Sequence, residues 1–362
     1  MTLINRSVMI MLTVFGAFAV ASADPKDSGK SEMESGEVDI SGYIQTQYEM
    51  HEDSRNATID DQGNLVKGNK DNIYIRRGRL KVEYQATKTS KFRIYFDGSK
   101  DKLSLLEAWI ELKRKFGSVG TKLRAGQQNI PFGFEIEYSS SKRDFPERST
   151  MERMLFAGER ERLVNVTVAP VPQLEFNVAV LNGPGIKDKE FTYESPFEDS
   201  KDFVGRVRTT HKTGRMKFSG GVSGYLGKQF DDGDTADFKT DKNRYGADAQ
   251  LEFTAFPKLG KSAVRGEVMI GEEFGLRKMG FYVWLTQQLG EHFGAAARYD
   301  MFDPNTRIED GSKLTQVSLA GHYYFDTHVR CTVSYDIRKD EEVGNNTDKA
   351  DNILNLVLQY AI

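Results

Sequence analysis

Lysine and arginine residues recur at every second position in several stretches of this sequence, as at Arg77, Arg79 and Lys81. Since successive side chains of a β-strand point to opposite faces, this spacing places the cations of each stretch on one face. Guanidinium and ammonium groups form charge-assisted hydrogen bonds with oxyanions. We therefore expect a wall of cations that contacts small anions, formed by Arg77, Arg79, Lys81, Arg93, Lys113, Lys122, Arg124, Arg206 and Arg208.

The strands that would position these cations follow from an alternation of apolar and polar residues that begins after residue 36. In the segment 37–50, Val38, Ile40 and Ile44 fall on one face, and most residues of the other face are polar or charged. Such a strand has one apolar face and one wet face. Similar segments continue to the end of the chain and predict an all-β fold, a transmembrane, antiparallel, up-and-down β-barrel of about 16 strands.

The composition agrees with such a barrel and excludes several other classes of protein. The mean hydropathy is -0.54 and 28% of the residues are charged. No apolar run approaches the roughly 18 residues that a membrane-spanning helix requires, so a helical membrane protein is excluded. The single cysteine, Cys331, excludes a disulfide framework and a cysteine-based zinc site. The net charge of -3 gives no indication of nucleic-acid binding.

Connection lengths provide an independent test, because outer-membrane barrels have short periplasmic turns and longer outside loops. The odd-numbered connections are long, as at 51–72 and 182–202, with shorter exceptions at 97–102 and 271–277. The even-numbered connections are short turns. A soluble β-sandwich explains any single alternating strand equally well, but it gives no reason for long and short connections to alternate.

The N-terminal residues 1–23 have the features of a cleaved signal peptide. Arg6 supplies a basic region, an apolar stretch of about 14 residues follows, and Ala21-Ser22-Ala23 fits a cleavage site. That stretch is too short for the alternative, an uncleaved membrane anchor. We expect residues 24–36 to form a flexible periplasmic lead-in, and residues 37–362 to form one barrel domain.

Several sequence segments form a recognisable pattern when they are taken together: Arg76–Leu80, Ala125–Glu135, Arg143–Ser149, Val180–Gly183 and Ala297–Pro304. This pattern resembles the phosphate-selective porins O and P of the bacterial outer membrane. The resemblance implies a barrel, usually trimeric, that passes anions with a preference for phosphate. The matched segments lie mostly at framework positions, so the resemblance assigns no individual residue to anion binding. The chain departs from such barrels at Ile362, where an aromatic residue is usual.

The connection 129–161 is the best candidate for a constriction of the channel. Structureless loops of this length are uncommon and often functional, and the resemblance places it where porins fold a loop into the lumen. Its candidate constriction residues are Lys142, Arg143, Asp144, Glu147, Arg148, Glu152 and Arg153. An acidic loop facing a basic wall would create a transverse field. The alternative is that the loop charges pair with one another and only hold its shape.

These observations predict an outer-membrane porin, a water-filled channel for passive diffusion of small hydrophilic solutes that favours anions such as phosphate. The expected partners are these anions, outer-membrane lipid and lipopolysaccharide, and further copies of the chain in a homotrimer. We expect no cofactor, no metal site and no nucleic-acid partner. The alternatives are a non-selective porin, whose lumen charges only solvate its interior, and a structural or adhesive barrel.

A lipid-hydrolysing outer-membrane barrel is a further alternative. Ser318 and His322 share one face of a predicted strand, as a nucleophile and its base would. Four residues along a strand separate them by about 13 Å, which is too far for a proton-transfer pair. We therefore expect no enzymatic activity.

Overall fold

The computed structural model of the chain describes most of the predicted barrel. The described residues are 33–52, 58–59, 65–66, 70–99, 102–156, 159–183, 201–230, 239–256, 258–308, 313–340 and 352–362. The predicted signal peptide (1–23) and most of the predicted lead-in (24–36) lie outside the described residues.

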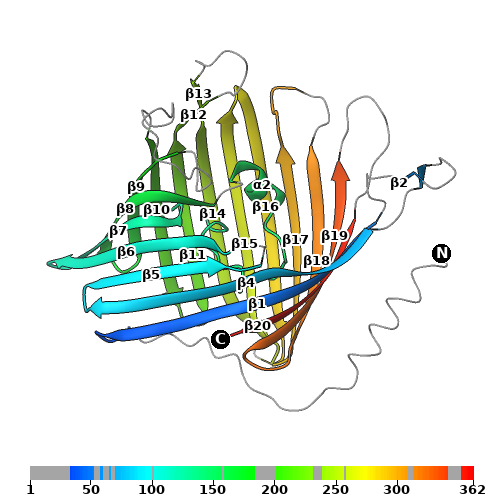
Figure 1. Ribbon diagram of the computed structural model, residues 1–362, viewed down its shortest axis with the longest axis horizontal. Coiled ribbons are helices and arrows are strands. Elements are labelled where there is room, and N and C mark those ends of the chain that lie inside the picture. Colours follow the sequence, from blue (N-terminus) through cyan, green and yellow to red (C-terminus); the bar gives the residue numbers. More distant parts are fainter. Residues whose placement is uncertain are drawn as a thin grey trace.

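Sixteen antiparallel strands form one closed barrel (Figure 1). β1 (Glu37–His51) closes the barrel by pairing with β4 (Lys70–Thr87) on one side and with β20 (Ile353–Ala361) on the other. The other barrel strands are β5 (Ser90–Asp97), β6 (Ser104–Phe116), β7 (Val119–Asn129), β8 (Arg160–Val171), β9 (Leu174–Leu181), β10 (Asp202–Thr213), β11 (Met216–Leu226), β14 (Asn243–Phe256), β15 (Gly260–Glu273), β16 (Leu276–Leu289), β17 (Phe293–Asp303), β18 (Leu314–Tyr324) and β19 (Val329–Asp340). The predicted fold is confirmed.

A few short elements lie outside the barrel wall. Two small two-stranded sheets pair β2 (Thr58–Ile59) with β3 (Leu65–Val66), and β12 (Lys228–Phe230) with β13 (Lys239–Asp241). The helix α2 (Thr150–Leu155) lies between β7 and β8 in the chain. Among the described residues, no helix has both the length and the apolar character needed to cross a membrane.

The two faces of the strands differ as the sequence alternation predicts. Ile40, Ile73 and Ile110 point outward and are more than half exposed, whereas Gln47 and Asp300 point inward and are fully buried. A continuous apolar surface therefore covers the outside of the barrel, and most of the buried inward side chains are polar or charged.

One departure from strict alternation occurs in β4. Gln45 of β1 pairs with Arg77, but the next residue, Thr46, pairs with Ile75, so Arg76 is an extra residue in a β-bulge. As a result, both Arg76 and Arg77 hydrogen-bond to groups inside the barrel. Strict alternation assigns Arg76 to the outer face, which is wrong for this reason. Two consecutive arginines in one predicted strand are the sequence signal that could have indicated the bulge.

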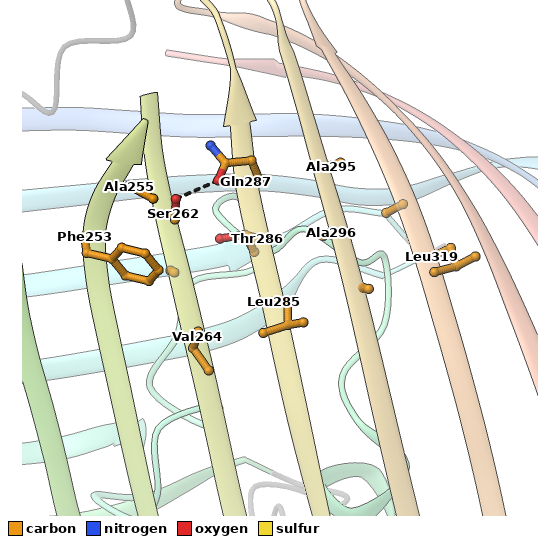
Figure 2. A pocket seen from close by; sticks show the side chains of 13 residues that line it. Phe253, Ala255, Ser262, Val264, Leu285, Thr286, Gln287, Ala295, Ala296 and Leu319 are labelled. Carbon is orange, nitrogen blue, oxygen red and sulfur yellow. Dashed lines mark hydrogen bonds between the residues drawn. The ribbon is translucent and has the colours of Figure 1, made fainter. Parts of the chain in front are cut away.

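A pocket of about 600 Å³ lies across β14 to β18 (Figure 2). The pocket exists because side chains such as those of Ala295 and Ala297 are too small to fill it. The outward-facing, half-exposed Leu285 and Leu319 border it. The Ser262 hydroxyl donates a 2.6 Å hydrogen bond to the Gln287 side chain, as Figure 2 shows. Because this pocket belongs to the outer face of the barrel, the charged interior does not include it.

Candidate functional site

The segment 130–156, between β7 and β8, lies inside the ring of strands (Figure 1). Its side chains Phe132 and Met151 are fully buried and form one hydrophobic cluster with Tyr282 and Trp284 of β16. Complete burial of one such side chain contributes about 1.5–3 kcal/mol. Apolar packing therefore fixes one side of this inserted segment against β16.

Inward-facing carboxylates also bind the backbone of the inserted segment. Glu267 of β15 accepts hydrogen bonds of 3.2 Å from the N–H groups of Phe134 and Glu135. Asp300 of β17 accepts a 3.1 Å hydrogen bond from the Thr150 N–H. The segment is thus attached to the wall at two separate places.

Gly133 allows the inserted segment to approach β15 closely. Its φ of +60° lies in the left-handed region, and a Cβ atom at this position would overlap the Glu267 carboxylate. Arg206 of β10 donates a hydrogen bond to the Gly133 carbonyl oxygen. The backbone at Gly133 is therefore held between two strands of the wall.

Two cavities lie on the other side of the inserted segment. The arginine cavity, of about 240 Å³, is lined by Arg76, Arg77, Arg79, Arg143, Glu147, Arg148, Glu152, Arg153, Phe156 and Glu159. The outer cavity, of about 350 Å³, is lined by Glu49, His51, Tyr74, Arg76, Glu147, Arg153, Asp336, Arg338, Ile353 and Asn355. The two cavities adjoin, since Arg76, Glu147 and Arg153 line both.

The ion pair between Arg76 and Glu147 lies where the two cavities meet. Arg76 Nε and Nη2 donate to the two Glu147 carboxylate oxygens at 2.6 and 2.8 Å, and Arg77 Nη2 lies 3.7 Å from the same carboxylate. Burial alone would raise the pKa of Glu147, but Arg77, Arg76 and Arg143 outweigh it and lower this pKa to about 2. Glu147 is therefore ionised at neutral pH.

Every residue of the predicted cation wall lies on an inward strand face, and each has a carboxylate partner. The pairs with their N–O distances are Arg77–Glu147 (3.7 Å), Arg79–Asp97 (2.8 Å), Lys81–Glu83 (3.2 Å), Arg93–Glu107 (2.9 Å), Lys113–Glu111 (3.9 Å), Lys122–Glu175 (3.5 Å), Arg124–Glu111 (2.5 Å), Arg206–Asp248 (3.0 Å) and Arg208–Glu175 (3.0 Å). Sequence analysis did not predict these pairs, four of which join neighbouring strands. They offset much of the positive charge of the wall.

Three arginines of the two cavities have no carboxylate partner among the described residues. Arg153 donates only to the Thr150 hydroxyl at 3.4 Å, and Arg338 donates to the Gln316 side chain at 3.1 Å. Arg143 lines the arginine cavity, and its Nε has no hydrogen-bond partner. These arginines without an ion-pair partner in the described part of the chain therefore lie in the cavities and not along the wall.

The remaining predicted constriction residues have different surroundings. Lys142 is exposed and lines neither cavity. Arg148 forms an ion pair with Glu159. Asp144 lies 3.8 Å from Arg265 and 3.5 Å from His322. Arg148 thus contacts the residue that precedes β8, and Asp144 contacts β15 and β18 of the wall.

Glu152, in α2, is fully buried, and neither of its carboxylate oxygens has a hydrogen-bond partner in the described part of the chain. Burial, followed by the nearby Glu267 carboxylate, holds the pKa of Glu152 well above its ordinary value. A buried carboxyl group without a partner is more stable when neutral. Within the inserted segment, Glu147 is thus ionised, whereas Glu152 favours its protonated form.

Ser318 and His322 do not form a hydrolytic pair. Ser318 accepts a 2.8 Å hydrogen bond from Gln316, and His322 Nδ1 lies 3.0 Å from the Thr332 hydroxyl. Both residues are buried polar groups of the barrel interior.

A closed barrel with an apolar outside, a charged inside and an inserted segment defines the porin class of outer-membrane channels. In sequence, the chain matches the family of phosphate-selective porins O and P over residues 44–263 and 278–362, and it belongs to that family. It is therefore a porin of the bacterial outer membrane. In sequence, no curated protein matches it.

Solved structures with the same fold have little sequence similarity to this chain. The outer membrane channel DcaP of Acinetobacter baumannii matches with a TM-score of 0.61 at 14% identity, over 91% of this chain and 98% of that one. An anion-selective porin from Comamonas acidovorans matches with a TM-score of 0.61 at 12% identity, over 90% and 100%. The trimer form of OmpT of Vibrio cholerae matches with a TM-score of 0.61 at 15% identity, over 91% and 100%. These likenesses describe the fold.

Proposed function

We propose that this porin passes small hydrophilic solutes by diffusion and favours anions such as phosphate. The observation that carries the proposal is the arginine cavity, which six arginines and three glutamates line. Two of these arginines, Arg143 and Arg153, have no carboxylate partner among the described residues. Concentrated positive charge in a confined wet channel attracts anions and repels cations.

The inserted segment would screen solutes by size, since it narrows the lumen beside β4. The solute would pass from the outer cavity into the arginine cavity. There, Arg143 and Arg153 would form charge-assisted hydrogen bonds with an oxyanion. The wall cations would add a weaker field, because their glutamate partners offset it. The family description and the anion-selective porin of Comamonas acidovorans support the same preference.

A non-selective porin is the second candidate function, and the carboxylate partners of the wall favour it. Ion substitution in planar bilayers separates the two. If anions carry the current, replacing chloride by the slower acetate lowers the single-channel conductance more than replacing potassium by the slower lithium does. Equal reductions would favour the non-selective porin.

Three further properties belong to the same proposal. The trimer form of OmpT supports a homotrimer for this chain. The apolar outer face supports contact with outer-membrane lipid, including lipopolysaccharide. Diffusion through a charged lumen needs no reacting group, so the porin would have no enzymatic activity.

A further inference from the structure

The ion pair between Arg76 and Glu147 differs from the deeply buried ion pairs of the barrel. The side chains of Arg76 and Glu147 are 29% and 28% exposed, whereas those of Arg206 and Asp248 are 2% and 1% exposed. A solute in either cavity can therefore reach Arg76 and Glu147. The side chains of Arg206 and Asp248 are too deeply buried for a solute to contact them.

The Glu147 carboxylate presents to Arg76 the same chemistry that a dissolved oxyanion would present. Two parallel N–H···O bonds join the groups, which is the geometry that a guanidinium adopts with either a carboxylate or a phosphate. When an anion moves between the two cavities, the Glu147 carboxylate already occupies the donors of Arg76. The anion must replace the Glu147 carboxylate to bind there.

The backbone around Glu147 is held independently of this carboxylate. Arg77 Nη2 donates a 3.1 Å hydrogen bond to the Pro146 carbonyl oxygen, and Arg298 Nη1 donates one of 3.1 Å to the Glu147 carbonyl oxygen. The side chain can therefore leave Arg76 by rotating about its own bonds while the inserted segment stays in place.

We propose that Glu147 is a tethered competitor, a carboxylate of the channel itself that occupies Arg76 until a permeating oxyanion displaces it. This inference rests on the proposed function as an anion-favouring porin and adds the residue that sets how tightly the anion binds. Conduction requires sites that bind a solute weakly enough to release it. Competition by Glu147 would weaken binding at Arg76 and keep the anion moving.

The test is Glu147→Gln, measured by the block of chloride current by inorganic phosphate in planar bilayers. Removing one charge about 4 Å from the anion changes its energy by about 1 kcal/mol in water, which is about 5-fold in binding. The half-block concentration is the phosphate concentration that halves the chloride current. We expect it to be about 5-fold lower than in the wild type. The matched control is Glu137→Gln, which removes the same charge from a pair with Arg208 that lines neither cavity. This control should leave the half-block concentration of phosphate unchanged.

A double-mutant cycle separates competition from a change in the shape of the inserted segment. If Glu147 acts through Arg76, Glu147→Gln should have little effect on half-block in an Arg76→Gln background. An equal effect in both backgrounds would overturn the inference, as would an unchanged or higher half-block concentration in the single variant. If the wild type neither favours chloride nor is blocked by phosphate, the proposed function itself fails.

Discussion

The Nη2 atom of Arg206 lies 3.0 Å from the Oδ2 atom of Asp248, and Arg206 also donates a hydrogen bond to the Gly133 carbonyl oxygen. This buried pair thereby joins β10 and β14 to the inserted segment. Removing one partner of such a pair leaves an uncompensated charge, which destabilises a protein by about 3–5 kcal/mol.

We expect Arg206→Met to lower the free energy of unfolding by about that amount, measured by urea titration of the protein in lipid vesicles. The double variant Arg206→Met/Asp248→Leu should recover part of the loss, because no unpaired charge is left. A single variant as stable as the wild type would show that the pair does not hold the inserted segment.

Gly133→Ala should displace the inserted segment from β15, because the added Cβ would overlap the Glu267 carboxylate and the φ of +60° disfavours alanine. We expect the single-channel conductance to change. Gly205→Ala is the control, since a Cβ atom there meets no other atom within 4 Å. Identical conductances for both variants and the wild type would contradict the proposed close approach.

Stability should depend on pH through Glu152. Its pKa is raised in the native state, so the native protein binds more protons than the unfolded chain above the ordinary glutamate pKa of about 4.3. The stability contributed by the neutral carboxyl is present below that value and is lost as the pH rises toward the native pKa. Urea titrations at several pH values should show a smaller decline for Glu152→Gln than for the wild type. Equal slopes would exclude Glu152 as the source.

Removing a wall pair should affect selectivity less than removing an arginine without a carboxylate partner. Arg143→Gln takes from the arginine cavity one positive charge that has no ion-pair partner among the described residues, and the anion-to-cation permeability ratio should fall by about 5-fold. Arg124→Gln/Glu111→Gln removes one positive and one negative charge and leaves the net charge of the wall unchanged, so the ratio should stay the same. A larger effect for the wall pair would show that the wall controls selectivity.

The sequence predicts the barrel well, because one apolar and one polar face per strand is a local property that repeats at every second residue. The sequence does not predict that Arg76 faces inward, because the β-bulge depends on pairing with β1 and shifts the alternation by one residue. The sequence also does not predict which glutamates pair with the cations of the wall. Glu111 and Arg124 lie opposite each other only once the register between β6 and β7 is fixed.

The site is predicted only in part. The sequence identifies the connection 129–161 and its charged residues, but their roles depend on contacts with distant strands. Arg143 and Glu147 are four residues apart, and yet one has no carboxylate partner among the described residues while the other pairs with Arg76 of β4. No spacing rule distinguishes them.

The zero-current potential across a bilayer with a potassium chloride gradient tests the central claim most directly. If the cavity arginines without an ion-pair partner among the described residues control permeation, this potential should lie close to the equilibrium potential of chloride. It should move toward zero in Arg143→Gln/Arg153→Gln. A wild-type potential at zero, or one close to the equilibrium potential of potassium, would contradict an anion-favouring porin.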